Sequence, residues 1–220
     1  MDAGTVRALL QGVGVSLLLW LGAMALALVA GLFVALGRIS PRAWIRWPAT
    51  FYVEVVRGIP LLVLIVWFHF VLFTGVLSLE HRVSAILALA VCYAAFMGET
   101  YRAGIEAVDP GQMEAARALG LRRKDAMRFV VLPQAVRNVL PALGNESIAL
   151  LKDTSLASAI AVPELFKRAM ETAGREFNYL PVLSAVALVY LVLTFLLTRV
   201  QRFLEGRSGG GATDPRPAHH

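Results

Sequence analysis

Two acidic residues interrupt an apolar segment in the second half of the chain. Glu146 and Asp153 stand about two helical turns apart, so both can project from one face if a helix persists between them. Charged groups inside a membrane-length apolar segment are costly, and they usually face a cavity or pair with each other. We therefore identify both residues as candidate ligands for a cationic group such as an ammonium. Neutral hydrogen bonds can come from their neighbours Asn145, Ser147 and Thr154.

Both carboxylates also have structural alternatives. Glu146 can pair with Arg137, with Lys152 or with a group of another subunit, as buried charges generally require a partner. Asp153 can instead cap the segment that follows it. These alternatives stay open beside the binding role.

The elements that must position these groups are membrane helices. The chain has 220 residues, of which 58% are hydrophobic and 16% are charged. Several apolar runs reach the roughly 20 residues that cross a bilayer. The formal net charge of +6 does not require nucleic acid, because the basic residues cluster between the apolar runs. The composition therefore predicts an all-α membrane protein with several spans.

Five apolar runs predict five transmembrane helices. They cover residues 13–36, 60–77, 83–107, 134–151 and 180–203. Small residues between Gly22 and Gly31 allow the first span to pack closely. Pro60 is expected to start or kink the second span. The fourth is short and polar, with Pro141 and Gly144 in its middle, so we expect it to be broken and packed among other helices rather than facing lipid.

The segments between and after the spans carry weaker signals. Residues 38–48 are basic and aromatic, which fits a membrane-surface turn, and residues 163–175 predict an amphipathic helix on the outer surface. The tail from Gly206 is predicted to be disordered, and we assign no function to His219 and His220. A cleavable signal peptide is not expected, because the first apolar run is too long and lacks a clear basic leader.

The distribution of basic residues predicts the orientation. Most of the 21 Lys and Arg residues lie after the first span, after the third span and in the C-terminal tail. The positive-inside rule places these regions in the cytoplasm, with the N-terminus outside and the C-terminus inside. A polar loop at 109–133 is then cytoplasmic, and its second half predicts a short helix from 125 to 132 that ends at Pro133.

The first half of this loop predicts a short helix with a sharp stop. Asp109 can cap it, Pro110 fits the first helical position, and Gln112 completes a capping box. Gly120 can end the helix in a left-handed conformation. Ala115, Ala116 and Ala118 leave a nearly bare face, which suits docking in a groove of another protein. An ordinary solvated surface helix is the alternative.

At this point the sequence resembles a known family. Glu114-Ala115-Ala116, followed by Gly120 and by Leu132-Pro133, resembles the cytoplasmic loop of permease subunits of bacterial ABC importers. Three further stretches, at residues 57–61, 98–105 and 152–156, narrow the resemblance to the polar-amino-acid uptake branch. The resemblance covers nearly the whole chain up to about residue 205. Ile59 departs from it, because the family more often has a small polar residue there.

The resemblance implies the permease fold of type I ABC importers, with a transmembrane domain at 1–205, the coupling loop at 109–133 and a disordered tail at 206–220. It implies transport of a polar amino acid across the cytoplasmic (inner) membrane by alternating access. The implied partners are cytoplasmic ATPase subunits, a second permease subunit, identical or paralogous, and an extracytoplasmic solute-binding protein. Glu146 and Asp153 would then bind the α-ammonium, or a basic side chain, of the amino acid.

The same resemblance gives the loop a role. It implies a coupling helix that docks in a cleft of the ATPase, where alanines permit close approach. Glu114 offers a carboxylate to basic partner residues, and Gly120 sets the angle between the two short helices. The candidate contact residues are Glu114, Ala115, Ala116, Gly120, Arg122 and Arg123.

Other chemistry finds little support in the sequence. The chain has no G-x-x-x-x-G-K-[ST] motif, so we expect ATP hydrolysis on a separate subunit. Four scattered histidines and one cysteine form no hydrolytic or metal-binding pattern, and we expect no catalytic site, metal or cofactor. Cys92, inside an apolar run, is expected to have a packing role. Glu99 and Arg102 lie one turn apart and predict a structural ion pair near the cytoplasmic end of the third span, within an inner gate.

Two other classes of protein compete with this interpretation. A secondary transporter would use its ionisable residues for proton or sodium coupling, but the loop motif and the small size argue against it. A membrane-embedded enzyme would need a nucleophile–base pair or a metal pattern. Within the leading interpretation, the alternative is an importer of another small solute.

Overall fold

The computed structural model describes residues 3–207, which are almost entirely helical and include no β-strand. The elements are α1 (Ala3–Arg38), α2 (Ala43–Gly58), α3 (Leu61–Trp67), the π-helical η1 (Phe68–Phe73), α4 (His81–Glu106), α5 (Pro110–Ala118), α6 (Arg123–Ala126), the π-helical η2 (Met127–Val131), α7 (Leu132–Asp153), the 3-10 helix η3 (Thr154–Ile160), α8 (Leu165–Glu176) and α9 (Tyr179–Arg207). The prediction of a disordered tail falls largely beyond the described residues, as do His219 and His220.

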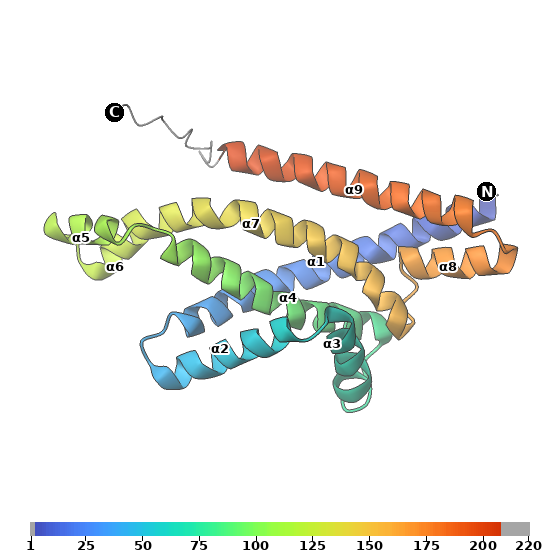
Figure 1. The fold of residues 1–220 in the computed structure, drawn as a ribbon, viewed down its shortest axis with the longest axis horizontal. Helices are drawn as coiled ribbons and strands as arrows, with labels where there is room; N and C mark the ends of the chain where they lie inside the picture. The colour runs from blue at the N-terminus through green and yellow to red at the C-terminus, as the bar shows by residue number, and fades with distance from the viewer. Residues whose placement is uncertain (1–2, 208–220) are drawn as a thin grey trace.

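The long helices run roughly along one axis of an elongated molecule (Figure 1). The short helices α5 and α6 lie at one end, and α8 lies at the other end beside the N-terminus. Near the middle, α3 projects sideways from the bundle. The loop at 109–133 and the amphipathic segment are therefore at opposite ends, as the expected topology requires.

The core is centred on the contact between α1 and α4, and small residues bring these two helices together. Ala23 and Ala27 of α1 are fully buried. A Cβ atom at Gly31 would lie 2.8 Å from the Cβ of Met97, and one at Gly98 would lie 2.6 Å from a methyl carbon of Val34. Distances this short leave no room for a side chain. The expected role of small residues in the first span is confirmed.

Three helices, α1, α4 and α9, are each long and apolar enough to cross a membrane. The pair formed by α2 and α3–η1 meets the same criterion only as a unit, and it is bent by 109° at a break near Pro60. The described residues therefore provide three spans, or four with the bent pair, where the sequence predicted five. The expected fourth span, α7, is not among them, because its polar residues lower its hydropathy.

The second predicted span, 60–77, corresponds to α3 and η1 and ends earlier, at Phe73. It is preceded by a separate helix, α2, which begins at Ala43, so residues 43–48 are helical and the predicted surface turn shortens to the few residues after Arg38. Pro48 lies inside α2, where it removes one hydrogen bond to the carbonyl of Trp44. This loss falls near the start of the helix, beside the highly exposed Trp44, so the helix tolerates it. Pro60 does start α3, as expected, after an extended residue at Ile59.

The prediction of a broken fourth segment was wrong, because α7 is continuous through Pro141 and Gly144. A side chain from α9 supports this stretch. The amide Nε2 of Gln201 donates to the carbonyl of Pro141 at 3.0 Å. A Cβ at Gly144 would lie 2.3 Å from Cδ of Gln201, so the glycine makes room for that side chain. Gln201 thus contacts α7 at both of the residues that weaken an isolated helix.

The predicted short helix at 125–132 does not end at Pro133. Instead α6 passes through the wide turn η2 directly into α7, and the N–H of Leu132 donates to the carbonyl of Met127. Pro133 then lies in the first turn of α7, where a missing N–H is tolerated. The loop and the fourth segment are therefore joined as one nearly continuous helical path.

The amphipathic segment is confirmed as α8. Its buried residues Leu165, Ala169 and Ala173 recur every fourth position and pack against the ends of α1 and α9. Glu164, fully buried, caps the helix by accepting from the N–H groups of Phe166 and Lys167 at 2.8 and 2.7 Å. This cap holds α8 at the end of the molecule opposite α5 (Figure 1).

Candidate functional site

The two predicted carboxylates lie near one another on α7. The hydroxyl of Tyr93, on α4, donates to Oδ2 of Asp153 at 2.6 Å. Glu146 is half-buried and lies within electrostatic reach of Tyr93, Asp153 and Arg57. Because α7 is continuous between the two acids, both can project from one face of it, and the charge of Asp153 acts on Glu146. Their role in binding stays a prediction.

The structural alternatives for these acids gain little support. Asp153 occupies the position before η3, but its side chain makes no capping hydrogen bond there, because it accepts from Tyr93 instead. Within residues 3–207, Glu146 forms no ion pair with Arg137 or Lys152. A pairing of Glu146 with another subunit is not tested by one chain.

The three neutral candidates do not join the acids. Asn145 faces α9, where its Oδ1 lies 3.5 Å from Nε2 of Gln201. The carbonyl of Ser147 accepts from Nε1 of Trp20 at 3.0 Å, and buried Thr154 donates to the carbonyl of Leu151 at 2.7 Å. Successive residues of an α-helix point about 100° apart, so the neighbours of Glu146 turn away from it.

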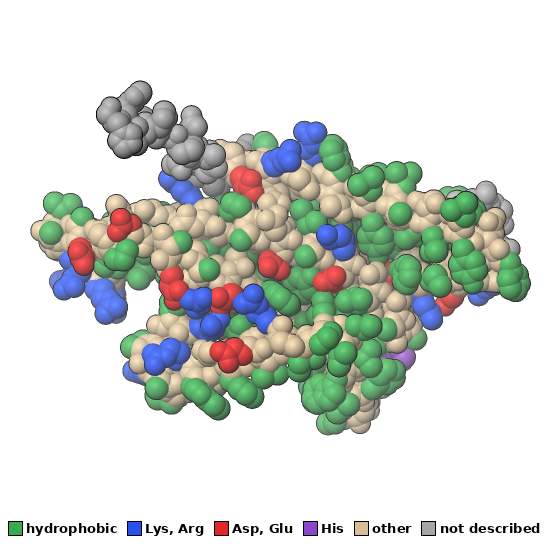
Figure 2. Space-filling view, in the orientation of Figure 1, with side chains coloured by type: hydrophobic (Ala, Val, Ile, Leu, Met, Phe, Trp, Pro, Cys, Tyr) green, Lys and Arg blue, Asp and Glu red, His purple; other side chains and the backbone are tan. Residues whose placement is uncertain are grey.

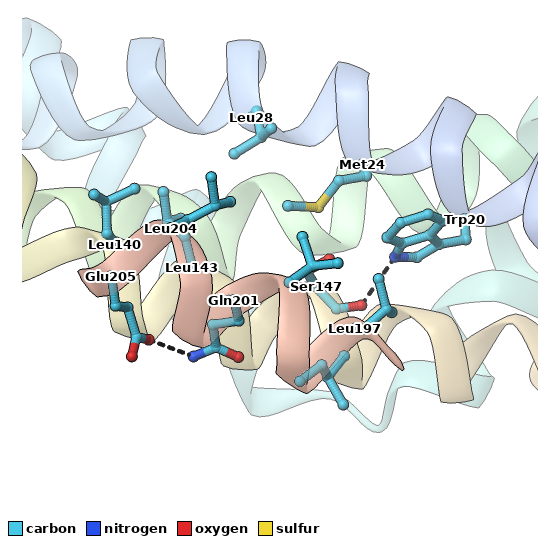
Figure 3. Close-up of a pocket in the computed structure, with 13 residues that line it drawn as sticks. Trp20, Met24, Leu28, Leu140, Leu143, Ser147, Leu197, Gln201, Leu204 and Glu205 are labelled. Carbon is cyan, nitrogen blue, oxygen red and sulfur yellow. Dashed lines mark hydrogen bonds between the residues drawn. The ribbon is translucent and has the colours of Figure 1, made fainter. Parts of the chain in front are cut away.

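Ser147 instead lines a cleft of about 310 Å³ enclosed by α1, α7 and α9 (Figure 3). Its walls are almost wholly apolar, with Met24, Leu143 and Leu197 pointing inward. The hydrogen bond between Gln201 and Glu205 closes one end at 2.8 Å. Glu205, at that end, is the one charged residue among those that line the cleft, and the rest of the lining is mainly apolar, so we do not place the binding site of a polar solute there.

A second hollow, of about 410 Å³, is polar and lies between α1, α2 and α4. It is lined by Arg38, Val53, Glu54, Arg57, Gly58 and Glu99. Figure 2 shows acidic and basic side chains gathered together in this part of the molecule, between α2 and α4. The hollow lies beside the same face of α4 that carries Tyr93 and Phe96, since Arg57 lies over the Phe96 ring.

The predicted pair of Glu99 and Arg102 is confirmed, and it belongs to a larger network. Nε of Arg102 donates to Oε2 of Glu99 at 3.1 Å. Arg38, at the end of α1, binds the same carboxylate, and Arg102 also pairs with Glu106. The network fastens α1 to α4. Sequence analysis missed Arg38 because it lies far from Glu99 along the chain, and an inner-gate role stays a prediction.

Two other functional candidates were also missed. Tyr93 and Arg57 came into view only through their contacts with Asp153 and Phe96, which lie on different helices. Arg57 did offer a signal in the sequence. It is a charged residue at the break of an apolar segment, directly before Gly58 and Pro60.

The loop at 109–133 begins as predicted. Oδ1 of Asp109 accepts from the N–H of Gly111 at 2.8 Å, and Pro110 occupies the first turn of α5. Gly120 has a φ of +88°, the left-handed conformation expected of it. The predicted capping box is absent from this helix, because the side chain of Gln112 accepts from Nε2 of Gln134 at 3.2 Å instead. That contact ties α5 to α7.

Most of the predicted contact residues of this loop are exposed. Glu114, Ala115, Gly120, Arg122 and Arg123 all lie on the surface. Ala116 is the exception, since it is the buried residue of α5, on a helix that packs against α6 and η2. Sequence analysis missed two apolar side chains of the same loop, Leu119 and Phe129, which are 84% and 64% exposed. The role of the loop in docking stays a prediction.

Comparison with known proteins places this architecture among transport proteins. Residues 27–209 match the family described as binding-protein-dependent transport system inner membrane component. The chain is 38% identical over 200 residues to the probable amino-acid ABC transporter permease protein YckA of Bacillus subtilis (strain 168), covering 89% of this chain and 87% of that protein. It is 35% identical over 199 residues to the glutamine transport system permease protein GlnP of Escherichia coli (strain K12), covering 88% and 90%.

A solved structure agrees with these relatives. The crystal structure of an amino acid ABC transporter with histidines superposes with a TM-score of 0.86 at 36% sequence identity. The superposition covers 92% of this chain and 94% of that one. The likeness therefore extends over the whole helical arrangement.

Proposed function

Because this chain belongs to the family of binding-protein-dependent transport system inner membrane components, we propose that it is the permease subunit of an ATP-driven importer for a polar amino acid. The observation that carries the proposal is the match to a solved amino acid ABC transporter along nearly the full length of both chains. The names of the relatives support the same class of substrate. The chain acts in the inner membrane as a multi-pass protein.

The substrate site of this proposal is the polar region beside Glu146 and Asp153. Both carboxylates lie on a polar stretch of α7, and Asp153 is held in place by Tyr93. An ammonium group of the substrate would replace hydration that these carboxylates lose between the helices. Asn145, Ser147 and Thr154 lose support as direct ligands, because their present contacts lie elsewhere.

The proposal includes five crossings, with α7 as the fourth. This helix has 22 residues, a length of about 33 Å, which is enough to cross a hydrocarbon core. It packs against α4 and α9, so its polar groups need not meet lipid. In Figure 2 many basic side chains lie at and near the end formed by α5 and α6, which supports a cytoplasmic position for that end.

The exposed loop is the proposed docking element for an ATPase subunit. Leu119 at its tip adds an apolar contact to the charged groups of Glu114, Arg122 and Arg123. Movement of this loop can reach the substrate region directly, because η2 joins it to α7 without an interruption. A second permease subunit, identical or paralogous, and an external solute-binding protein complete the proposed assembly.

Reconstitution tests the proposal. The chain is co-purified with the ATPase and the binding protein encoded beside it, and the complex is placed in proteoliposomes. We expect ATP-dependent accumulation of radiolabelled L-glutamine, L-arginine or another polar amino acid. Uptake driven by a proton or sodium gradient without ATP would instead identify a secondary transporter. ATP-dependent uptake restricted to solutes other than amino acids would contradict the proposed substrate class but would still agree with an ATP-driven importer.

A further inference from the structure

The apolar cleft enclosed by α1, α7 and α9 has no part in the proposed binding of a polar solute, yet it is large enough to hold a ligand. Its volume of about 310 Å³ lies at the lower end of the range for small-ligand pockets, about 300–1,000 Å³. Met24, Leu143 and Leu197 point into it (Figure 3). On α7 its lining extends from Leu140 to Ile148, a length of about 12 Å, which approaches the roughly 15 Å of one leaflet of the hydrocarbon core. A single hydrocarbon chain fits a cleft of this length and lining.

The two ends of the cleft differ in polarity (Figure 3). At one end lies the ring of Trp20, whose Nε1 is already occupied because it donates to the carbonyl of Ser147 at 3.0 Å. At the other end, Nε2 of Gln201 donates to Oε1 of Glu205 at 2.8 Å. A carboxylate that accepts one hydrogen bond keeps further lone pairs for a second donor. The cleft is therefore mainly apolar along its length and charged at one end, which suits an amphiphile.

A second charge lies towards the same end as Glu205. Helices α7 and α9 run in opposite directions (Figure 1), and Gln201 of α9 donates to the carbonyl of Pro141 of α7 at 3.0 Å. Glu205 follows Gln201 by about one turn. Arg137 precedes Pro141 by about one turn and lies just beyond Leu140, on the side of α7 that lines the cleft. Both charges are thus displaced towards the end formed by α5 and α6, which is cytoplasmic in the proposed orientation.

The two charges lack an opposite charge, and one wall of the cleft is open to the outside. In the part of the chain that the structure describes, no ion pair includes Arg137 or Glu205. The lining residues Val200 and Leu204 of α9 are 54% and 50% exposed, so a ligand from the surrounding lipid can reach the cleft. A headgroup that joins a phosphate to an ammonium brings the complementary charge to each residue.

We propose that this cleft binds one phospholipid of the cytoplasmic leaflet, with a zwitterionic phosphoethanolamine headgroup. One acyl chain lies in the cleft against α1, α7 and α9. The phosphate pairs with the guanidinium of Arg137, and the primary ammonium donates to the carboxylate of Glu205. This ligand goes beyond the import reaction, because it is not the transported solute. It fills the space beside α7, the helix that carries Glu146 and Asp153, so the membrane lipid becomes part of the structure that supports the candidate site.

The test measures lipid binding by the purified permease–ATPase complex in detergent, using native mass spectrometry. The probes are dioleoyl-phosphatidylethanolamine, dioleoyl-phosphatidylcholine and dioleoyl-phosphatidylglycerol, which share their acyl chains and differ in the headgroup. We expect phosphatidylcholine to bind about 10-fold more weakly than phosphatidylethanolamine, because its trimethylammonium has no hydrogen to donate. Glu205→Gln should remove this preference. Arg137→Gln should weaken the binding of both zwitterionic lipids about 10-fold, because they share the phosphate.

Two further variants separate the cleft from the surface around it. Leu143→Phe adds bulk inside the cleft and should weaken the binding of all three lipids by a similar factor. Arg202→Gln is the matched control for Arg137→Gln, because Arg202 is an exposed arginine of α9 that does not line the cleft, although it follows Gln201 directly. This control should leave the binding of each lipid unchanged. Gel filtration measures the assembly of every variant with the ATPase.

Several outcomes would overturn the proposal. The wild-type complex could bind the three lipids equally or prefer phosphatidylglycerol, and Glu205→Gln could keep the preference for phosphatidylethanolamine. Unchanged lipid binding by Leu143→Phe would place the lipid outside the cleft. Reduced assembly of both Glu205→Gln and Arg137→Gln would show instead that a second subunit covers this end of the cleft. None of these measurements depends on uptake, so the proposed import of an amino acid is tested separately.

Discussion

At the scale of single residues, side-chain direction decides function. Glu146 and Asp153 reach the polar region with Tyr93 and Arg57, while Asn145 turns towards α9. Asn145 and Glu146 are neighbours in the sequence, yet their side chains face different surroundings. A charge change at Glu146 therefore tests recognition with little change in shape.

Glu146→Gln should assemble with the ATPase but lose most substrate binding and uptake, with basal ATP hydrolysis retained. The amide keeps the shape of the side chain and removes the charge that attracts an ammonium. Uptake assays and co-purification measure the two effects. If Glu146 instead holds an ion pair with the second subunit, assembly or thermal stability falls first, by about 3–5 kcal/mol. Native transport by a well-assembled variant would argue against both roles.

A second prediction for a single residue concerns the backbone conformation of Gly120. Gly120→Val should lower uptake and substrate-stimulated ATP hydrolysis while the protein still reaches the membrane. No atom crowds a Cβ at Gly120, so the damage comes from the φ of +88°, which a β-branched residue adopts at a cost of about 1–3 kcal/mol. Gly14→Val is the control, since that glycine also has open space but lies in an ordinary helix. If the Gly120 variant couples ATP hydrolysis to transport normally, the proposal that this loop docks on the ATPase is wrong.

At the scale of elements, α8 depends on one buried carboxylate. Glu164 accepts from two backbone N–H groups of α8, and the hydroxyls of Ser16 on α1 and Tyr190 on α9 donate to it at 3.4 Å. Burial raises the pKa of Glu164 above its ordinary value, although the hydrogen bonds that it accepts oppose this rise. The three helices thus meet at a group whose ionisation is costly.

The stability of this junction should therefore depend on pH. A carboxyl group with a raised pKa in the folded state binds protons more tightly there, so its contribution is fully present below the ordinary carboxyl pKa and is lost as pH rises through the raised value. We expect the Tm of the purified protein to gain this contribution as pH falls through the raised pKa towards the ordinary carboxyl pKa, and Glu164→Gln to remove this pH dependence. Identical pH profiles of Tm for the two proteins would show that Glu164 does not titrate in this range.

At the scale of the whole molecule, the two ends of the elongated bundle are formed by different helices. The loop of α5 and α6 lies at one end, α8 and the start of α1 lie at the other, and α7, which carries Glu146 and Asp153, runs between them (Figure 1). This order suits a protein that receives solute on one side of a membrane and a mechanical signal on the other. The same order predicts which positions a reagent reaches from each side.

Cysteine labelling tests the orientation in a Cys92→Ala background, since Cys92 is fully buried and packs in the core as expected. Gly4→Cys and Thr172→Cys should react with an impermeant thiol reagent added from outside. Gly111→Cys should react only after the membrane is opened. All three positions are at least partly exposed, so burial does not mask them. The reverse labelling pattern would invert the proposed topology.

The sequence by itself determined the features that depend on near neighbours. Helix α8, the Asp109 cap, the left-handed Gly120 and the pair of Glu99 and Arg102 follow from patterns within about four residues, where backbone and side-chain preferences act directly. Long apolar runs likewise predicted the membrane helices α1, α4 and α9, because burial in lipid requires only length and hydropathy.

The tertiary structure decided everything that depends on contacts between distant segments. Helix α7 stays continuous through Pro141 and Gly144, where local propensity would interrupt it, and Gln201 of α9 packs against both residues. Arg38 reaches Glu99 from α1, and Tyr93 reaches Asp153 from α4. Arg57 of α2 lies over the ring of Phe96 of α4. Such contacts form only when helices pack, and no local pattern encodes which side chains will meet.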